Sequence, residues 1–230
     1  MMVFCSLDSR PVPRIAPHPA QIEAARIKRE GDHARISRQS GDCAGRQRKI
    51  GQAVVAAFRA ADVRVMVADI TPTPEAEGVA FQLCDLRDNA QITALVAATK
   101  TQVGHIDFLV NVACSYLDNG LPTTRADWLT ALDINIIGSV MLVQAAQANL
   151  AANKGAIVNF GSISSRVAQT RRWVYPVSKA TILQLSRSRA IDLAPHGIPV
   201  DAVSPGWTWR RAKCCPASAC SSTPCRMNAT

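Results

Sequence analysis

The apolar residues of the middle of the chain follow two alternating periods. Short and nearly continuous apolar runs, as in strands buried on both faces, alternate with longer stretches in which apolar residues recur every three or four positions, as on one face of a helix. In chain order, the expected elements are helix 50–60, strand 63–69, strand 79–85, helix 88–103, strand 106–111, helix 125–148, strand 155–160, helix 178–194 and strand 198–203. This alternation predicts an α/β fold, a doubly wound parallel sheet of the Rossmann-like type with helices on both faces.

The two flanks do not continue this pattern. Residues 34–40 contain two arginines and three other polar side chains, so they cannot form a central strand that is buried on both faces. We therefore expect an irregular basic flank over 1–43, a dinucleotide-binding catalytic domain over 44–209 and an irregular cysteine-rich tail over 210–230. The sheet is expected to be incomplete at its first strand and at the C-terminus.

Charge follows the same division. Residues 51–200 hold twelve basic and eleven acidic side chains, so the net charge of +9 arises mainly in the flanks. A nucleic-acid reader usually carries its basic surface on a folded face, so we expect no nucleic-acid partner. A basic-armed nucleic-acid binder remains the weakest of three hypotheses, and it would show steeply salt-dependent DNA association.

Neither a membrane span nor a metal site is predicted. The most apolar window, 136–152, is interrupted by four polar side chains, and the run Met2-Val3-Phe4-Cys5 is too short for a secretory signal. We expect a cytoplasmic protein without a membrane partner. Four cysteines crowd the tail without forming a Cys-x-x-Cys pair, which favours reduced thiols over a zinc site or a disulfide framework: Cys214, Cys215, Cys220 and Cys225.

The strongest chemical signal is Tyr175-Pro176-Val177-Ser178-Lys179 at the start of a predicted helix. A spacing of four residues places Tyr175 and Lys179 on the same helical face. A lysine ammonium beside a phenol stabilises the phenolate, which gives a general base that works near neutral pH.

Together with the Tyr-x-x-x-Lys pair, four further motifs resemble the short-chain dehydrogenase/reductase family, in the family's order, over roughly 50–209. Two of them are Ser162, thirteen residues before Tyr175, and Asn135 in a helix. The others are Asn111-Val112-Ala113-Cys114, which differs from the family's Asn-Asn-Ala-Gly at two positions, and the Pro205-Gly206 turn. The resemblance implies an oxidoreductase that moves hydride between a nicotinamide cofactor and a small alcohol or carbonyl substrate.

The resemblance also assigns roles. Tyr175 is expected to exchange a proton with the substrate, Ser162 to orient the substrate oxygen, Lys179 to hold the nicotinamide ribose, and Asn135 to carry a water in the proton relay. Ser164 and Ser165 compete with Ser162 for its role, and Asn135 could instead satisfy a helix kink. The helices 125–148 and 178–194 resemble the pair through which the family forms dimers and tetramers, so a homodimer or homotetramer is expected.

Cofactor contacts are expected at the ends of the predicted strands. Asp69 follows the strand 63–69, where an acid binds a free adenosine ribose and repels a 2′-phosphate; NAD is therefore favoured over NADP, although the nearby Arg48 argues the other way. The full set of expected cofactor residues is Gly45, Ile50, Gly51, Asp69, Asp85, Leu86, Asn111, Ala113, Tyr175, Lys179, Pro205 and Gly206.

The phosphate-binding loop is poorly matched. A dinucleotide fold needs glycines at this position so that the backbone can approach the pyrophosphate. Gly45 and Gly51 fit the outer positions of the family's loop, but Lys49 replaces its middle glycine. One hypothesis is that the residues before about Lys49, and the tail after Trp209, are read in a shifted frame, which resequencing of the gene would test. The poorly matched loop also supports a second hypothesis for the function, in which the chain is a decayed, non-catalytic relative that acts as a binding protein.

Overall fold

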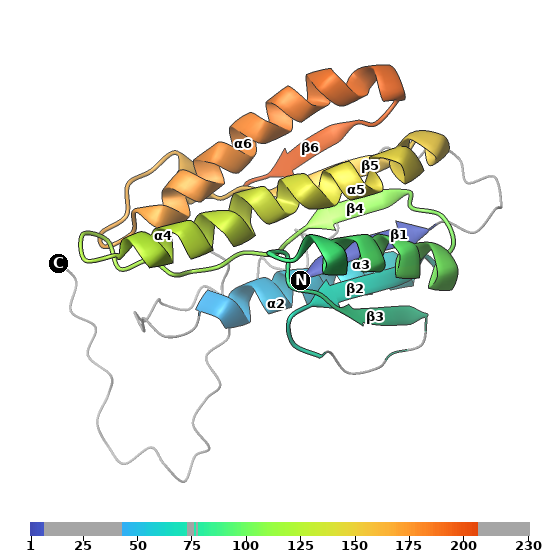
Figure 1. Cartoon of the computed structure of the whole chain (residues 1–230), viewed down its shortest axis with the longest axis horizontal. Helices are drawn as coiled ribbons and strands as arrows, with labels where there is room; N and C mark the ends of the chain where they lie inside the picture. The colour runs from blue at the N-terminus through green and yellow to red at the C-terminus, as the bar shows by residue number, and fades with distance from the viewer. Residues whose placement is uncertain (7–42, 73–75, 77, 207–230) are drawn as a thin grey trace, which may run out of the picture.

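Figure 1 shows the computed structural model of the chain, which describes residues 1–6, 43–72, 76 and 78–206. A six-stranded sheet forms its centre, in the order β3-β2-β1-β4-β5-β6. The strands are β1 (Met2–Ser6), β2 (Arg64–Asp69), β3 (Val79–Leu83), β4 (Phe108–Asn111), β5 (Ala156–Phe160) and β6 (Val200–Val203). The α/β Rossmann-like fold expected from the sequence is therefore confirmed.

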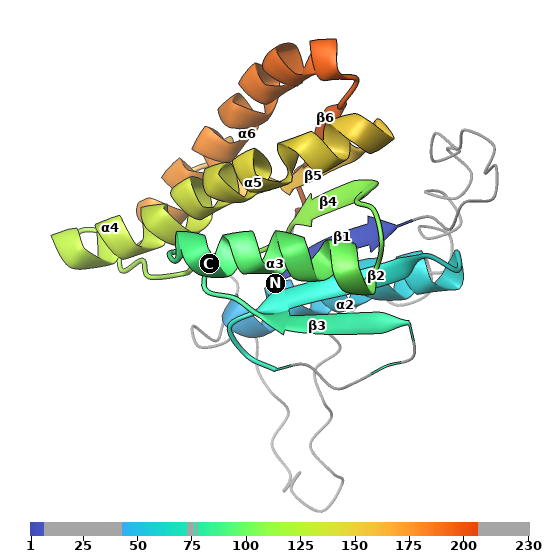
Figure 2. The same ribbon diagram turned by 45° about the vertical axis from the view of Figure 1, so that its right-hand side comes forward.

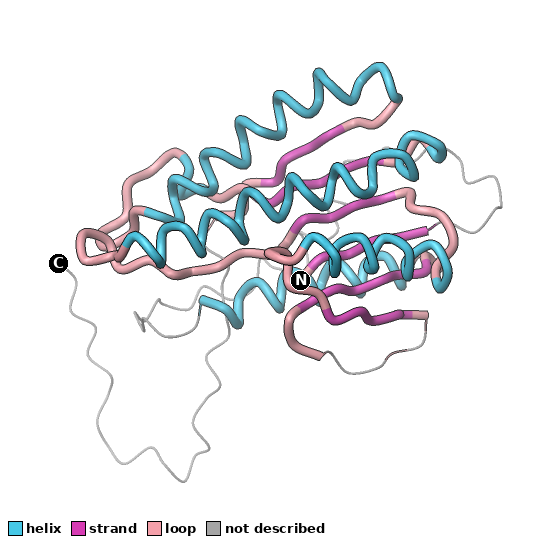
Figure 3. Tube along the Cα trace, viewed as in Figure 1, coloured by secondary structure: helices cyan, strands magenta, loops and turns pink. Residues whose placement is uncertain are grey.

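Helices cover both faces of the sheet (Figures 1 and 2). One face carries α3 (Asn89–Gln102), the continuous helical segment α4 (Arg125–Leu132), η1 (Asp133–Ile137) and α5 (Gly138–Asn153), and α6 (Val174–Leu193). The other face carries α2 (Cys43–Ala60). Two short 3₁₀ turns, η2 (Ile163–Ser165) and η3 (Ala194–His196), complete the elements. Figure 3 shows the regular alternation of strand and helix after β2, which matches the expected elements to within a few residues at each end.

The central strand is the main departure from the sequence expectation. We expected residues 1–43 to be irregular and the first strand to be missing, but Met2–Ser6 forms β1 between β2 and β4. Residues 7–42, the rest of that flank, lie outside the described residues. The apolar run Met2–Cys5 is too short for a signal sequence, but a short, wholly apolar run also suits a strand that is buried on both faces.

Strand β1 runs antiparallel to both of its neighbours, so the sheet is mixed and not wholly parallel as expected. Met2 pairs with Ala68 and Asn111, and Cys5 pairs with Val65 and Phe108. The remaining strand pairs are parallel. Because of this reversal, the start of β1 lies at the carboxyl ends of β2 and β4, which is the edge where ligands bind in such sheets.

Both faces of β1 are packed. Met2 and Phe4 join the apolar core beneath α3 and α5, whereas Val3 and Cys5 join a second core beneath α2. All five side chains of the strand are buried. The alternation of side chains along a strand thus lets one short segment connect the two cores.

The segment that we expected to be a glycine-rich loop is helical. Helix α2 begins at Cys43, so Gly45, Ile50 and Gly51 lie within a helix. At Gly51, a Cβ atom would come within 1.7 Å of the Met1 side chain, so only glycine leaves space for Met1 there. Among the described residues, the strand that precedes this helix is β1, and it runs in the direction opposite to the one that the family's loop requires.

The segment from Arg125 to Asn153 is one continuous helix that contains a π-helical turn, Asp133–Ile137. By length and composition it could cross a membrane, with a mean hydropathy of 1.6 in its most apolar window. Its buried side chains, among them Leu142, Ala146 and Leu150, nevertheless belong to the core beneath the sheet. This packing is that of a core helix.

Candidate functional site

The carboxyl-end edge of β4 and β5 carries a cluster of buried polar side chains. Asn111 ends β4 and donates its amide to Asn159 of β5 over 2.6 Å, and Asn159 in turn donates to Ser186 of α6 over 2.9 Å. The side-chain oxygen of Asn111 is buried without a hydrogen-bond partner in the described structure. A buried, unsatisfied acceptor calls for a ligand or a water, which marks the space next to Asn111 as a site.

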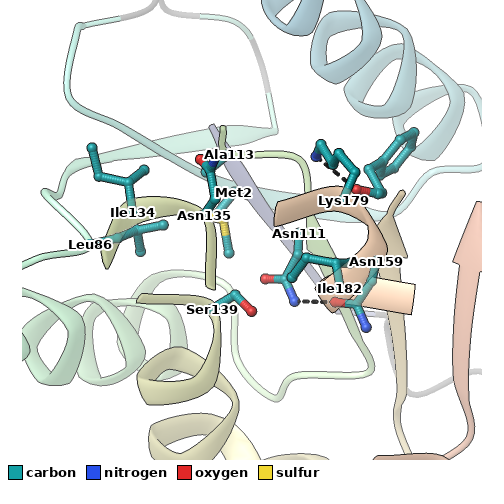
Figure 4. A pocket seen from close by; sticks show the side chains of 11 residues that line it. Met2, Leu86, Asn111, Ala113, Ile134, Asn135, Ser139, Asn159, Lys179 and Ile182 are labelled. Carbon is teal, nitrogen blue, oxygen red and sulfur yellow. Dashed lines mark hydrogen bonds between the residues drawn. The ribbon is translucent and has the colours of Figure 1, made fainter. Parts of the chain in front are cut away.

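A narrow pocket opens beside this cluster (Figure 4). It is lined by side chains from six elements and from the segments that follow β3 and β4: Met2, Leu86, Asn111, Ala113, Ile134, Asn135, Ser139, Asn159, Phe160, Lys179 and Ile182. In Figure 4 the unpaired oxygen of Asn111 points away from Asn159, toward Met2 and Ser139. Five of the residues expected from the sequence thus meet here: Leu86, Asn111, Ala113, Asn135 and Lys179.

Lys179 lies one helical turn after Tyr175, as its spacing predicts. Its side chain is 3% exposed, and its ammonium donates a hydrogen bond of 2.8 Å to the carbonyl oxygen of Phe160. The same nitrogen lies 5.8 Å from the centre of the Tyr175 ring. A charge held in a buried position close to the phenol is the arrangement that the proposed base chemistry needs.

Asn135 lies in the π-helical turn and is 4% exposed. Its side-chain oxygen accepts the backbone N–H of Ser115 over 2.5 Å, and its amide donates to the Ser115 carbonyl and to the Ser178 hydroxyl. Ser178 in turn donates to the carbonyl of Tyr175. The side chain of Asn135 therefore ties the segment after β4 to the first turn of α6. Sequence patterns gave no sign of the π turn, although such turns occur often at functional sites.

Ser162 follows β5 and is 6% exposed. Its hydroxyl accepts the backbone N–H of Ser164 and donates to the Ser164 hydroxyl over 3.0 Å. Ser165 bonds instead to the backbone carbonyl of Ser162, so Ser164 is the rival that shares the environment of Ser162. The carbonyl of Pro205 accepts the N–H of Ile163, which joins the turn after β6 to this loop, whereas Gly206 is exposed.

The adenosine end of the expected cofactor site is filled by the protein itself. Oδ2 of Asp69 lies 3.5 Å from the amino group of Met1, and its Oδ1 accepts the N–H of Thr71. Met2 lines the pocket next to it, and the cavity that remains measures about 10 Å³, roughly the space that one water needs. With Met1 and Met2 in these positions, the adenosine half of a dinucleotide does not fit beside Asp69, and the polar groups of Asn111 and Lys179 line the same small cavity.

Asp85 also has a protein partner. The Arg87 guanidinium binds its carboxylate at both oxygens, and this hydrogen bonding holds the pKa of Asp85 below its usual value. Leu86 packs against Gly138, where a Cβ atom would come within 2.6 Å of the leucine. Leu86 thus reaches the pocket, while Asp85 does not line it and is held in an ion pair with Arg87.

Cys84, directly before this pair, is expected to be unreactive in the folded protein. Burial, reinforced by the neighbouring Asp85 and Asp88 charges, raises the pKa of the Cys84 thiol to about 11. Because the thiolate is the nucleophile, alkylation by iodoacetamide at pH 8 should be slower than that of a free cysteine by about two orders of magnitude. Peptide mapping of Cys84 in native and denatured protein checks this, and equal rates would contradict it.

Two contacts to Tyr175 were missed by the sequence analysis. The ring of Tyr116 stacks on that of Tyr175 with 4.8 Å between centroids, and the Asp118 carboxylate accepts the backbone N–H of Tyr175 over 2.8 Å. Neither Tyr116 nor Asp118 belongs to a recognisable motif. Both residues have polar side chains that can contribute to a site, but they lie far from Tyr175 in the sequence. No sequence pattern therefore predicts that they contact Tyr175.

Known proteins are similar to this chain over most of its length. The profile of a protein family described as "Enoyl-(Acyl carrier protein) reductase" matches residues 44–219. The chain is 34% identical to galactitol 2-dehydrogenase of Agrobacterium fabrum over 70% of its length and 67% of the relative. It is 28% identical to L-fucose dehydrogenase of Mus musculus, over 76% of this chain and 68% of that protein. Among solved structures, "ElxO with NADP Bound" is similar with a TM-score of 0.63 and 26% identity, over 68% of each chain. The chain thus spans about two thirds of the length of these proteins.

Proposed function

Because the chain belongs to the short-chain dehydrogenase/reductase family, a family of oxidoreductases, we propose that it is a nicotinamide-dependent dehydrogenase of small alcohols. The observation that carries this proposal is the buried ammonium of Lys179 beside the Tyr175 ring, at the wall of a pocket that also holds Asn135 and an unpaired Asn111 oxygen. The named relatives act on a sugar or a sugar alcohol, which favours a polyol or sugar substrate.

The proposed roles of the residues follow from their positions. The phenolate of Tyr175, which the buried charge of Lys179 stabilises, takes the proton of the substrate hydroxyl and becomes the phenol. Ser162, held in its loop by Ser164, orients the substrate oxygen, while Asn135 joins the segment around Ser115 to α6. Transfer of the hydride belongs to the nicotinamide.

The proposed cofactor is NAD, although the solved relative described above holds NADP. Asp69 supports this choice because a carboxylate at the end of β2 repels a 2′-phosphate once Met1, its partner in this structure, has moved away. Activity is tested with galactitol, L-fucose and related polyols, with NAD and NADP compared at each substrate. A higher kcat/KM with NAD supports the proposal. Absence of turnover with every polyol and both cofactors, together with no binding of NADH, would favour a non-catalytic relative instead.

That second function has one observation in its favour, which is the filling of the adenosine end by Met1 and Met2. It also yields a prediction. Replacing Met2 with alanine opens the pocket and should tighten NADH binding by about tenfold, since the apparent Kd falls as the fraction of binding-competent molecules rises. Fluorescence titration with NADH measures this.

Met66→Ala is the matched control for this experiment. Met66 is buried in the same core on the neighbouring strand, but it does not line the pocket. Both variants should lose similar stability, and only Met2→Ala should gain affinity. Equal affinities in the two variants would show that Met2 does not restrict the cofactor.

We also propose that the chain acts in the cytoplasm and as a homodimer or homotetramer. The helices of the expected interface expose apolar side chains to solvent, among them Leu129, Ile137 and Ile191. Light scattering on the purified protein tests the self-association.

A further inference from the structure

The segment that follows β4 contacts Tyr175 at two points. The Tyr116 ring stacks on the ring of Tyr175 at an angle of 20°. Two residues later, Oδ2 of Asp118 accepts the backbone N–H of Tyr175 over 2.8 Å, and Oδ1 accepts the N–H of Trp173 over 2.9 Å. The side chain and the backbone of Tyr175 are therefore both contacted by one short piece of chain, Tyr116–Asp118.

Helix α6 needs such a partner because it lacks a cap of its own. Its N-cap residue, Trp173, makes no side-chain capping bond. The first N–H groups of a helix have no partner within the helix, and a carboxylate placed there is favoured both by hydrogen bonding and by the helix dipole. Asp118 supplies this carboxylate from a distant part of the sequence. The orientation of the first turn, in which Tyr175 lies, consequently depends on Asp118.

Asp118 is itself held in place. Its Oδ1 also accepts the N–H of Gly120, and its backbone carbonyl accepts a hydrogen bond from Arg172. Gly120 has φ +70°, and a Cβ atom there would lie 2.9 Å from the Cα of Arg171, so the turn packs directly against the chain that leads into α6. At the other end of the segment, Ser115 is bonded twice to Asn135. The segment thus links Asn135 to Tyr175 as one hydrogen-bonded unit.

We propose that Asp118 is a positioning residue for Tyr175, and that the ring of Tyr116 supports the phenol from the side. This inference rests on the proposed function. Neither residue lines the pocket, so their effect is on the placement of the phenol and not on cofactor binding. Small displacements of a reacting group carry large costs in rate, because the geometry of the reacting atoms is narrow.

The kinetic test compares Asp118→Ala with a matched loss of a helix cap. Asp118→Ala should lower kcat by about 10- to 100-fold and leave the KM for the cofactor within about twofold. Thr124→Ala removes the same kind of bond from α4, where the Thr124 hydroxyl accepts the N–H of Asp127. This control should keep kcat within about twofold of the wild type, because α4 does not carry the phenol.

Asp118→Asn serves as the conservative variant, and it decides the question if the alanine variant does not fold. An asparagine keeps one acceptor oxygen, so it can hold either Trp173 or Tyr175 but not both. Its kcat should therefore lie between those of the wild type and Asp118→Ala. Retention of full kcat by both variants, or an equal loss in Thr124→Ala, would overturn the proposal.

A readout that does not need activity separates this inference from the proposed function. Tyr116 and Tyr175 are the two tyrosines of the chain, so Tyr116→Phe and Tyr175→Phe define the tyrosine contribution to the near-ultraviolet circular dichroism. Asp118→Ala should reduce that contribution, and Thr124→Ala should not. A wild type without turnover in which Asp118→Ala still reduces this signal would contradict the proposed function while supporting the placement of Tyr175 by Asp118. An unchanged signal in Asp118→Ala would overturn the placement whatever the activity.

Discussion

Replacing Tyr175 with phenylalanine should lower kcat by about 10²- to 10⁴-fold, the range in which a positioned general acid or base contributes. The substitution removes one oxygen and retains the ring, so the stack on Tyr116 can persist. The backbone N–H that Asp118 accepts is also unchanged. The loss is therefore a loss of proton transfer, and the KM for the cofactor should change little. Steady-state kinetics with the best polyol substrate measure both parameters.

The control for this experiment is the fold of the variant. Thermal unfolding of Tyr175→Phe should match the wild type closely, because the core residues of α6, among them Ile182 and Leu193, are untouched. A variant that keeps more than about a tenth of the wild-type kcat would show that Tyr175 is not the general base. Ser162 and Lys179 would then have to be assessed without it.

Replacing Phe4 with alanine should destabilise the protein by about 3–5 kcal/mol, the range for removing a fully buried aromatic side chain. Phe4 is 0% exposed, lies in the middle of the central strand and packs in the core beneath α3 and α5. Urea denaturation of the two proteins, analysed with a common dependence on denaturant, gives the difference in the free energy of unfolding.

Leu121→Ala provides the comparison, since Leu121 is 79% exposed and its loss should change stability by less than about 0.5 kcal/mol. A similarly small effect of Phe4→Ala would mean that Met2–Ser6 does not fill the central position of the sheet. The pair of variants therefore tests the placement of β1, which is the least expected feature of the fold.

Most of the sheet and helices could be predicted from the sequence, because short, mostly apolar runs alternate with longer segments after β2. The exceptions have physical causes. A run of four apolar residues such as Met2–Cys5 is too short to show a helical or strand periodicity. It forms a strand because it pairs with both β2 and β4 in the sheet. Gly45 and Gly51 suggested a loop. A helix nevertheless tolerates single glycines, and the residues between these two favour helix formation.

The proximity of Tyr175 and Lys179 could be predicted from the sequence, and their surroundings less well. The spacing of Tyr175 and Lys179 follows from helical geometry, so their proximity was foreseen. The partner of Asp69 could not be inferred, because Met1 reaches Asp69 through the reversal of β1. Asp118 meets Tyr175 only through the tertiary arrangement of a loop and a helix, and no local pattern encodes such a contact.

The π-helical turn Asp133–Ile137 sets the rotation of the α5 side chains about the helix axis relative to those of α4. Each residue added to or removed from a helix turns everything beyond it by about 100°. Gly138 follows the turn directly and faces Leu86 so closely that no side chain fits between them, while Leu142 and Leu150 beyond it must face the sheet. The number of residues from Thr124 to Gly138 is therefore fixed: a single deletion would rotate Leu142 and Leu150 away from the sheet and withdraw Asn135 from Ser115.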